Sequence, residues 1–481
     1  MEKYLLNRGM QGKKNYQEKL FTTFQLSERV PNDNIYRRLK ELLDLQWLYK
    51  ATAQYYGTEG QASVDPVVFF KLILIGYLEN QPSDRRIINT VSMRLDMLYF
   101  IGYDIDEPLP WHSTLSRTRQ LFGADVFRNL FRQILKQCIE KGMVSGRRQA
   151  LDSALVNANA SMDSLLEKAI LDDADAYANG LGEEEDKNTD VDSASGKGKM
   201  KKNETHYSPT DPDARLATKP GRPTRLNYLA QVSVDTASHL ITNIQAHHAD
   251  KRDSECLAEV ITNTTNNLQS EGLIVEEVLA DTNYSSGEAL RYLEDNAITG
   301  YIPNLGQYKA ERQGFIYDKE KDLYICSQGN KIVYKNIYRS SDGHYKKEYS
   351  GSKKICGICP LRVQCIGKSK VKRITDTIDK PLYDRMHKRM KTIKGIRMRK
   401  LRQSTVEPVL GTLLNFLGMR RLNTKGIEQA DKGMLMAAIA YNLKKLLKFK
   451  FPRLNAMAKV MEKFQKPLQK IPFCLVAITP A

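Results

Sequence analysis

The stretch Gln403–Asn415 reads Gln-Ser-Thr-Val-Glu-Pro-Val-Leu-Gly-Thr-Leu-Leu-Asn, and Glu407 is its one acidic residue. The run before it, Tyr383–Arg402, is rich in Lys and Arg and contains a single acid, Asp384. An isolated carboxylate beside so much positive charge indicates a metal ligand next to a phosphate backbone. We therefore take Glu407 as the starting point of a candidate site.

The same residues also fit the start of a helix. Ser404 and Glu407 have the spacing of a capping box, in which each side chain bonds the backbone of the other residue. Pro408 would then lie in the first turn, close to the position that proline favours. On this stretch alone, a capping role and a metal-binding role for Glu407 both remain open.

Two other isolated acids can complete a metal site with Glu407. Asp152 lies in the predicted strand Gln149–Val156, and Asp281 follows the apolar run Ile274–Ala280. We predict that these three carboxylates hold divalent metal ions that cut and join DNA. Three rival acids rank lower because they lie in a predicted turn or a polar loop: Asp235, Asp250 and Asp253.

Composition points to a polyanionic partner. The chain has 481 residues, 41% of them hydrophobic, and a net charge of +18 with a pI near 9.3. Such a surplus favours nucleic acid over a membrane surface as the partner. No run of about 18 apolar residues and no signal peptide are found, so we expect a cytoplasmic protein without a membrane span. An odd number of cysteines, seven, argues against a disulfide framework.

The N-terminal part is predicted to be helical. Residues 1–30 form a weakly patterned arm, and 31–145 form an all-helical DNA-binding domain. Asp65 and Pro66 mark a helix start, since Asp is a favoured N-cap and Pro a favoured first residue. The helix that follows, Val67–Leu78, is apolar nearly all round and should therefore be buried.

A helix-turn-helix motif is possible within residues 83–122. Arg117 and Arg119 would lie exposed on one of its helices and contact a DNA end through the major groove. The alternative is that these arginines only solvate an exposed helix face.

From residue 146 onwards the periodicity changes to that of an α/β domain. Strands, a helix and further strands follow in the order Gln149–Val156, Tyr228–Val234, His239–Gln245, Glu255–Leu268 (the helix), Ile274–Ala280 and Ile298–Pro303. This order is that of a ribonuclease-H-like mixed sheet flanked by helices, with the second and third strands as a hairpin. We place the first part of this catalytic domain at 146–307, with an acidic and then basic flexible insertion at 163–225.

Four cysteines fall within a Cys-rich insertion at 308–373. Cys356 and Cys359 form a knuckle suited to tetrahedral zinc, while Cys365 follows it and Cys326 lies far upstream. We predict a structural Zn²⁺ held by these four thiolates, with His344 as a substitute for Cys326. Free buried thiols are the alternative. The isolated cysteines are expected in hydrophobic cores: Cys138, Cys256 and Cys474.

The second part of the catalytic domain spans 374–450 and carries the glutamate helix. A long helix, Ile427–Leu447, is apolar along one side except for Asn442 and should pack on the sheet. The tail, 451–481, receives no role. Basic residues on either side of Glu407 are predicted to contact DNA: Arg397, Arg399, Lys400, Arg402, Arg420 and Arg421.

Five stretches together resemble bacterial insertion-sequence transposases of the DDE type, in particular the group numbered eleven-eighty-two. They are Pro110–Arg117, the Leu-Asp-Ser at Asp152, Asp211–Arg215, Ala280–Tyr284 and Val406–Gly411. Asn283 replaces the glycine usual in the fourth. Related transposases often carry Tyr, Arg and Lys around the glutamate; here Lys400 stands near the Tyr position, Leu414 stands at the Lys position, and Arg402 is the candidate Arg.

The resemblance implies a chemistry as well as a fold. Two Mg²⁺ (or Mn²⁺) ions, about 3.5–4 Å apart, would be held by the three acids and would activate first water and then a DNA 3′-hydroxyl. The partners implied are double-stranded DNA, as terminal inverted repeats and as target, and a second copy of the chain on that DNA. Two rivals remain: a catalytically silent DNA-binding protein derived from a transposase, and a metal-dependent nuclease that cuts without joining.

Overall fold

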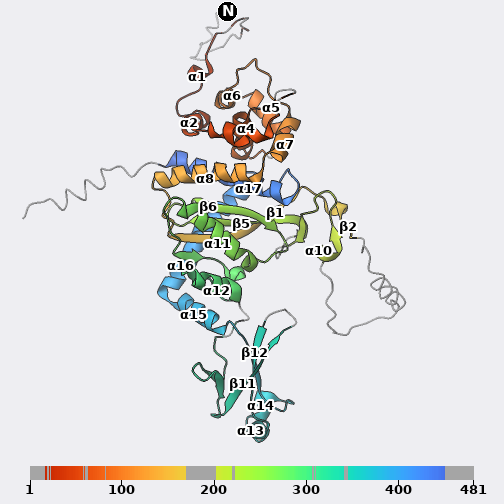
Figure 1. The fold of residues 1–481 in the computed structure, drawn as a ribbon, viewed down its shortest axis with the longest axis vertical. Coiled ribbons are helices and arrows are strands. Elements are labelled where there is room, and N and C mark those ends of the chain that lie inside the picture. The colour runs from red at the N-terminus through yellow and green to blue at the C-terminus, as the bar shows by residue number, and fades with distance from the viewer. Residues whose placement is uncertain are drawn as a thin grey trace, which may run out of the picture.

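The computed structural model describes residues 17–449, apart from 19–20, 22, 58, 60–62, 82, 169–201, 219–220, 222, 306–307, 309 and 341–344. Most of the predicted N-terminal arm, most of the charged insertion, His344, Cys474 and the tail 451–481 lie outside the described residues. Figure 1 shows an elongated molecule, with helices at one end, a mixed sheet in the middle and a smaller sheet at the other end.

The N-terminal helices surround one apolar helix. They are α1 (Leu26–Arg29), α2 (Ile35–Leu42), α3 (Trp47–Thr52), η1 (Ala53–Tyr55), α4 (Pro66–Leu78), α5 (Asp84–Ser92), α6 (Leu95–Ile101), α7 (His112–Leu121) and α8 (Ala124–Glu140). The predicted start of α4 is confirmed, because the Asp65 carboxylate accepts hydrogen bonds from the backbone N–H groups of Val67 and Val68. Nearly every residue of α4 is buried, as its all-round hydrophobicity predicted.

The central sheet has mixed strand directions. Its strands are β1 (Arg148–Asn157), β4 (Arg215–Ala217), β5 (Arg225–Asp235), β6 (Ile241–His248), β7 (Glu277–Leu279) and β8 (Thr299–Tyr301). β5 pairs antiparallel with β1 and with β6, which confirms the predicted hairpin, whereas β7 runs parallel to β1 and β8 parallel to β7. β4 pairs with the first residues of β5, along the same edge as β6. β1 therefore lies at the centre of the sheet.

Helices pack on this sheet and join it to the N-terminal region. They are η3 (Thr282–Tyr284), α11 (Asp253–Gln269), α12 (Gly287–Asp295), α15 (Lys380–Lys391), α16 (Ile393–Phe416) and α17 (Ile427–Lys448). α17 packs on β6 and also on α8 and α4, so it forms a shared layer between the N-terminal helices and the sheet (Figure 1). The prediction that this helix packs back on the sheet is confirmed.

Polar side chains of α17 satisfy the backbone of the edge strand β6. The buried Asn442 amide accepts from the N–H of Ile241 and donates to its carbonyl, at 3.0 and 2.9 Å. Eleven residues earlier, about three helical turns away, Asp431 accepts from the N–H of Ala246 at 3.0 Å. Both contacts pair backbone groups that a buried sheet edge would otherwise leave without partners.

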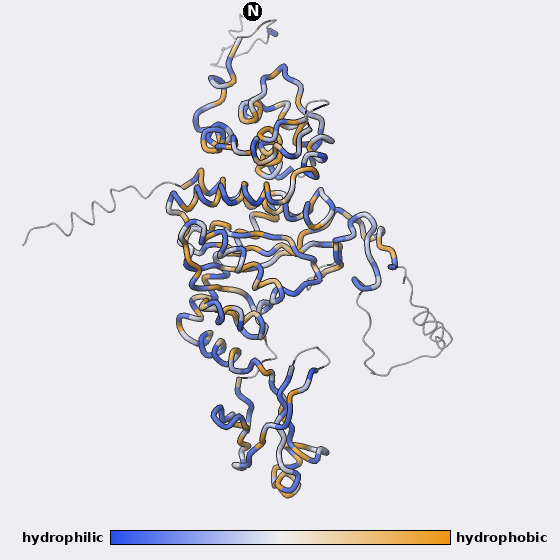
Figure 2. The backbone as a smooth tube through the Cα atoms, in the orientation of Figure 1, coloured by the Kyte–Doolittle hydropathy of each residue, from blue (hydrophilic) through white to orange (hydrophobic). Residues whose placement is uncertain are grey.

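The smaller sheet lies at the far end of the molecule. Its strands are β9 (Phe315–Asp318), β10 (Leu323–Cys326), β11 (Lys331–Arg339), β12 (Tyr345–Ser350) and β13 (Arg373–Thr377), with α13 (Lys353–Gly357) and α14 (Arg362–Ile366) between the last two. A small core of Tyr324, Ile332, Tyr349 and Ile374 stabilises it. Figure 2 shows that hydrophilic residues dominate this end. The remaining short elements are η2 (Met162–Ser164), β2 (Leu166–Glu167), α10 (Lys202–Thr205) and β3 (His206–Tyr207).

The capping-box interpretation of Ser404 and Glu407 is wrong. α16 begins much earlier, where the Thr392 hydroxyl accepts from the backbone N–H of Gly395, and it continues to Phe416. Ser404, Glu407 and Pro408 therefore lie in the helix interior, where the proline removes one backbone hydrogen bond. The basic run Tyr383–Arg402 is divided between two helices, α15 and the first half of α16, which are separated at Thr392. Within the described residues, no helix is both long and apolar enough to span a membrane.

Candidate active site

The first two predicted acids come from neighbouring parallel strands, one on its strand and one just after it. β1 and β7 pair in a register that places Ala150 opposite Leu279, the last residue of β7. Asp152 lies on β1 two residues beyond that pair, and Asp281 follows the end of β7 by two residues, before η3. The parallel pairing of β1 and β7 thus brings near each other two acids that are 129 positions apart in the chain.

The third acid reaches the sheet from α16, which packs across β1. The connection is made by Arg402: its Nη1 lies 3.0 Å from Oδ2 of Asp152, and its Nη2 lies 3.8 Å from Oε1 of Glu407. The side chains of Arg402 and Asp152 are only 14% and 18% exposed, whereas that of Glu407 is 51% exposed. One guanidinium thus bridges two of the three predicted acids at the edge of a solvent-accessible site.

Asp281 is electrostatically part of the same group. Burial raises the pKa of its carboxyl group, and the nearby Asp152 carboxylate raises this pKa further because two negative charges repel each other. The backbone N–H of Asn283, which donates to Oδ1 at 2.9 Å, and the charge of Arg402 act in the opposite direction. We refer to Asp152, Asp281, Glu407 and Arg402 as the cluster: Asp281 interacts through its charge with Asp152 and Arg402, and Glu407 lies beside Arg402.

The rival acid Asp235 has a structural role. It is fully buried at the end of β5 and accepts hydrogen bonds from the backbone N–H groups of Gly146 and Ala237 and from the Ser145 hydroxyl. Asp250 lies in a turn, 3.8 Å from the guanidinium of Arg215. Neither arrangement connects these acids with the cluster.

The third rival acid, Asp253, lies at the start of a helix. It is the first residue of α11 and not part of a loop, and it accepts from the Gln231 amide at 2.7 Å. Its charge also raises the pKa of Asp281, so it lies within electrostatic reach of the cluster. The same amide of Gln231 accepts from the buried hydroxyl of Tyr284, three residues after Asp281.

The carboxylate oxygens of the cluster are chemically suited to a hard cation, but they are not arranged around one ion position. Among the described residues, no three His, Cys, Asp or Glu side chains are close enough together to hold a metal ion. The donor set itself consists of carboxylate oxygens, the ligands that Mg²⁺ prefers. Arg402 lies between two of them, so a positive charge already occupies part of the space that an ion would need.

The four predicted zinc ligands line one pocket, although they come from separate segments. Cys326 ends β10, Cys356 lies in α13, Cys359 follows it, and Cys365 lies in α14. In the described residues these thiols do not approach one another closely enough to count as a metal-binding group. Cys138 and Cys256 are buried as predicted, and burial raises the pKa of each thiol to about 12.

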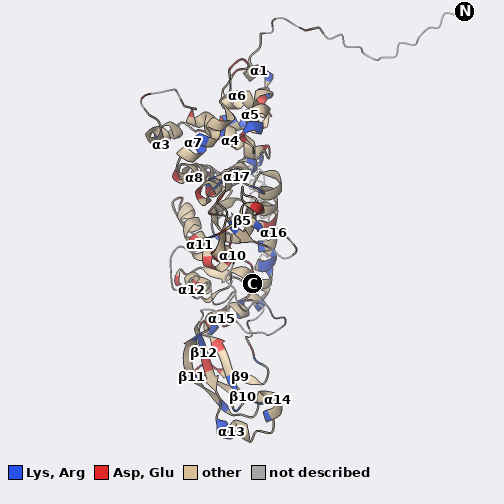
Figure 3. Ribbon diagram, turned by 90° about the vertical axis from the view of Figure 1, so that its right-hand side faces the viewer, with Lys and Arg blue, Asp and Glu red and all other residues tan. Residues whose placement is uncertain are grey.

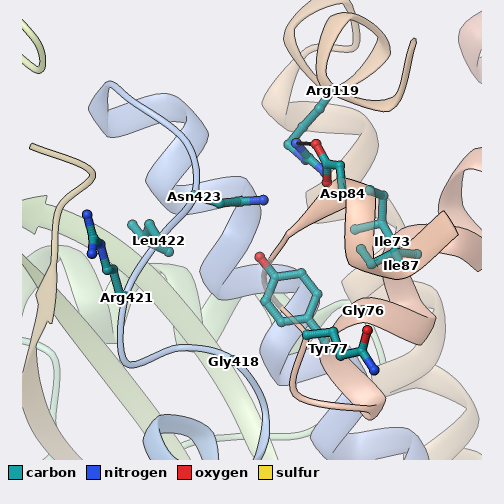
Figure 4. Close-up of a pocket in the computed structure, with 11 residues that line it drawn as sticks. Ile73, Gly76, Tyr77, Asp84, Ile87, Arg119, Gly418, Arg421, Leu422 and Asn423 are labelled. Atoms are coloured by element: carbon teal, nitrogen blue, oxygen red, sulfur yellow. Dashed lines mark hydrogen bonds and ion pairs between the residues drawn. The ribbon is translucent and has the colours of Figure 1, made fainter. Parts of the chain in front are cut away.

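Most of the predicted DNA-contacting residues are exposed. Figure 3 shows Lys and Arg along α16, and the exposed members of the predicted set are Arg117, Arg397, Arg399, Lys400, Arg420 and Arg421. The prediction that Arg119 is exposed is wrong. Its guanidinium is buried and bonds the Asp84 carboxylate at 2.6 and 3.1 Å beside the loop of Arg421, Leu422 and Asn423 (Figure 4). Arg119 therefore stabilises the junction between the N-terminal helices and the sheet region.

Two protein-family models match separate parts of the chain. A family model described as a transposase domain (DUF772) matches residues 24–121, and one described as a transposase DDE domain matches residues 325–447. The chain is a DNA transposase of the DDE type. The first match covers the helical N-terminal region of this transposase, and the second includes Glu407. Both matches confirm the resemblance to DDE-type transposases.

The similarity of the chain to a solved structure is weak. Among solved structures, this transposase is similar to a chain described as "Mos1 transposase paired-end complex with left transposon end". The sequence identity is 12%, the match covers 57% of this chain and 73% of that chain, and the TM-score is 0.16, which is too low to carry an argument. The comparison with curated proteins gives no match.

Proposed function

We propose that this transposase cuts and joins DNA at a ribonuclease-H-like site formed by Asp152, Asp281 and Glu407. The observation that carries the proposal is that the Arg402 guanidinium lies beside both Asp152 of β1 and Glu407 of α16, at 3.0 and 3.8 Å. Asp281, two residues after β7, is within electrostatic reach of Asp152 and Arg402. Titratable residues that are coupled in this way are candidates for a functional site.

These three carboxylates would hold two Mg²⁺ or Mn²⁺ ions, which activate the attacking oxygen and stabilise the leaving oxygen of a DNA phosphodiester. The chain itself supplies the orientation of the ligands. β1 carries Asp152, its parallel neighbour β7 leads to Asp281, and the N–H of Asn283 would orient the Asp281 carboxylate. The Glu407 side chain is half exposed, so it would remain accessible to an approaching DNA backbone.

Basic residues on the same helix would position the phosphate backbone. Arg397, Arg399 and Lys400 are exposed within about three helical turns before Glu407. Their charges would neutralise phosphates of the element end and of the target DNA, and a homodimer on paired ends would place two such sites together.

The function is tested with purified full-length chain and a labelled duplex that carries the native element end. We expect nicking at the end with Mg²⁺ or Mn²⁺, no cleavage with EDTA, and joined product when target DNA is added. Cleavage without any joined product would favour the simple nuclease. Binding without cleavage, in any divalent metal, would favour the catalytically silent DNA-binding protein.

The salt dependence of DNA binding gives a separate prediction. Arg399→Ala is expected to weaken binding of any duplex sequence and to lower the slope of log K against log salt by roughly one, because one phosphate contact is lost. Fluorescence anisotropy at several salt concentrations measures both quantities. Arg119→Lys is the matched control, since Arg119 is buried and paired and should leave the slope unchanged. An unchanged slope for Arg399→Ala would remove α16 from the DNA interface.

We also propose that zinc closes the pocket of four cysteines. The support is that thiols from β10, α13 and α14 line the same pocket in a part of the chain with only a small core. Structural zinc often supplies stability that such a small module lacks. We expect about one zinc per chain by metal analysis, and its loss in Cys356→Ser but not in Cys138→Ala. Zinc-free protein whose Cys326, Cys356, Cys359 and Cys365 thiols all titrate freely would contradict this proposal.

A further inference from the structure

Arg402 differs from its basic neighbours on α16 in its low exposure. Arg397, Arg399 and Lys400 are exposed, whereas the Arg402 side chain is 14% exposed and lies against Asp152. A long cationic side chain is rarely buried unless it is paired. The position of Arg402 is therefore set by the acids of the site and not by solvation of the helix.

The Arg402 guanidinium contacts the same atoms that a metal ion would need. It binds Oδ2 of Asp152 at 3.0 Å, while Oδ1 of Asp152 accepts from the backbone N–H of Ser153 at 2.8 Å. Both oxygens of this carboxylate are thus already engaged. The second guanidinium nitrogen lies 3.8 Å from Glu407, and the planar fork of Arg suits such a bridge better than the ammonium of Lys.

Without a cation, this site would be unfavourable. The Arg402 guanidinium lies beside the carboxylates of both Asp152 and Glu407, at 3.0 and 3.8 Å, so without it these two negative charges would lack their positive neighbour. A buried or half-buried charge that loses its partner costs several times more than an exposed one. Arg402 therefore offsets part of the repulsion between acids that are gathered for another purpose.

We infer that Arg402 is a built-in counter-cation that holds the acids together in the metal-free chain and must leave Asp152 when divalent ions bind. This inference rests on the proposed function, since it assumes that Asp152, Asp281 and Glu407 are metal ligands. Arg402 is then a positioning residue that competes with the metal ion. Its guanidinium keeps the carboxylates in place before DNA binds, and it weakens the binding of metal ions in the absence of DNA.

The experiment is a calorimetric titration of the full-length chain with Mn²⁺ in the absence of DNA, together with thermal unfolding without metal. Arg402→Gln is expected to bind Mn²⁺ at least about fivefold more tightly than the unmodified chain, because a nearby positive charge no longer opposes the ion. Its metal-free form should unfold at a lower temperature, and Mn²⁺ should restore that loss. Arg402→Lys should lie between the two. Arg399→Gln, which removes one exposed charge from the same helix, is the matched control and should change neither quantity.

The outcomes separate the inference from the function on which it rests. Mn²⁺ binding by the unmodified chain with equal or weaker binding by Arg402→Gln would overturn the counter-cation role and leave the metal site standing. A merely structural role for Arg402 would give this second result, since loosening a site weakens its affinity. Absence of Mn²⁺ binding in every variant would overturn both proposals. Circular dichroism confirms that each variant is folded before titration.

Discussion

Asp281→Asn is expected to lower the rate of metal-dependent DNA cleavage by at least about a hundredfold while leaving DNA binding intact. Loss of a residue that merely orients a metal ligand already costs 10–100-fold in many metal sites, so loss of a ligand itself should cost at least the upper end of that range. The substitution preserves shape, because the amide oxygen of Asn can still accept the N–H of Asn283. Cleavage of an end-containing duplex and a gel-shift assay measure the two properties.

The same substitution should stabilise the metal-free chain at neutral pH. Burial and Asp152 raise the pKa of Asp281 in the folded state above its unfolded value. The folded state therefore binds protons more readily than the unfolded state, and stability falls as the pH rises through the interval between these two pKa values. Asn removes this cost above the folded-state pKa of Asp281, and the gain should shrink as the pH is lowered through that pKa.

Asp250→Asn is the matched control for both measurements. It changes the same functional group at a rival acid that lies in a turn beside Arg215. It should leave both cleavage and DNA binding unchanged. Full cleavage by Asp281→Asn, or loss of cleavage in Asp250→Asn to the same degree, would reject the assignment of Asp281 as a ligand.

Asn442→Leu is expected to have the largest effect on stability, a loss of about 2–4 kcal/mol in the free energy of unfolding. Its amide is fully buried and satisfies both the N–H and the carbonyl of Ile241 on the edge strand β6. Leucine has a similar volume but no hydrogen-bonding group, so two buried backbone groups lose their partner, at about 1–3 kcal/mol each. Chemical denaturation followed by circular dichroism measures the change.

Asn89→Leu provides the comparison for this stability prediction. Asn89 is exposed on α5, and an exposed substitution of this kind usually changes stability by less than about 0.5 kcal/mol. If Asn442→Leu also cost less than about 1 kcal/mol, the edge of β6 would not depend on α17. The proposed role of α17 as the layer that joins the N-terminal helices to the sheet would then lose its energetic basis.

The sequence was sufficient for those parts of the fold that local signals determine. Asp65 and Pro66 predicted the start of α4, and the alternation of Tyr228–Val234 predicted one strand of the β5–β6 hairpin. Asp152 and Asp281 could be selected because each stands alone on or just after an apolar strand. Their pairing depends on a parallel register between β1 and β7, which the sequence does not encode locally.

Tertiary packing overrode the local signals at two residues. Ser404 and Glu407 have capping-box spacing, yet α16 extends through them because its apolar residues Val406 and Val409 are buried on one face. Arg117 and Arg119 could not both be exposed, since residues two apart on a helix point in nearly opposite directions. Only packing decides that Arg117 faces solvent and Arg119 pairs with Asp84.

Arg402 was predicted to contact DNA, but its bridging position could not be predicted. Its sequence neighbours are equally basic, and only the crossing of α16 over β1 directs this one side chain towards Asp152. The contact between Arg402 and Asp152 therefore follows from the way in which α16 crosses the sheet.

Anomalous diffraction from crystals of the full-length chain soaked in Mn²⁺ tests the central claim most directly. The account predicts an anomalous peak within coordination distance of carboxyl oxygens of Asp152, Asp281 and Glu407, with the Arg402 guanidinium moved away from Asp152. A fully soaked crystal without a peak among these three residues, or with a peak that contacts only other acids, would contradict it.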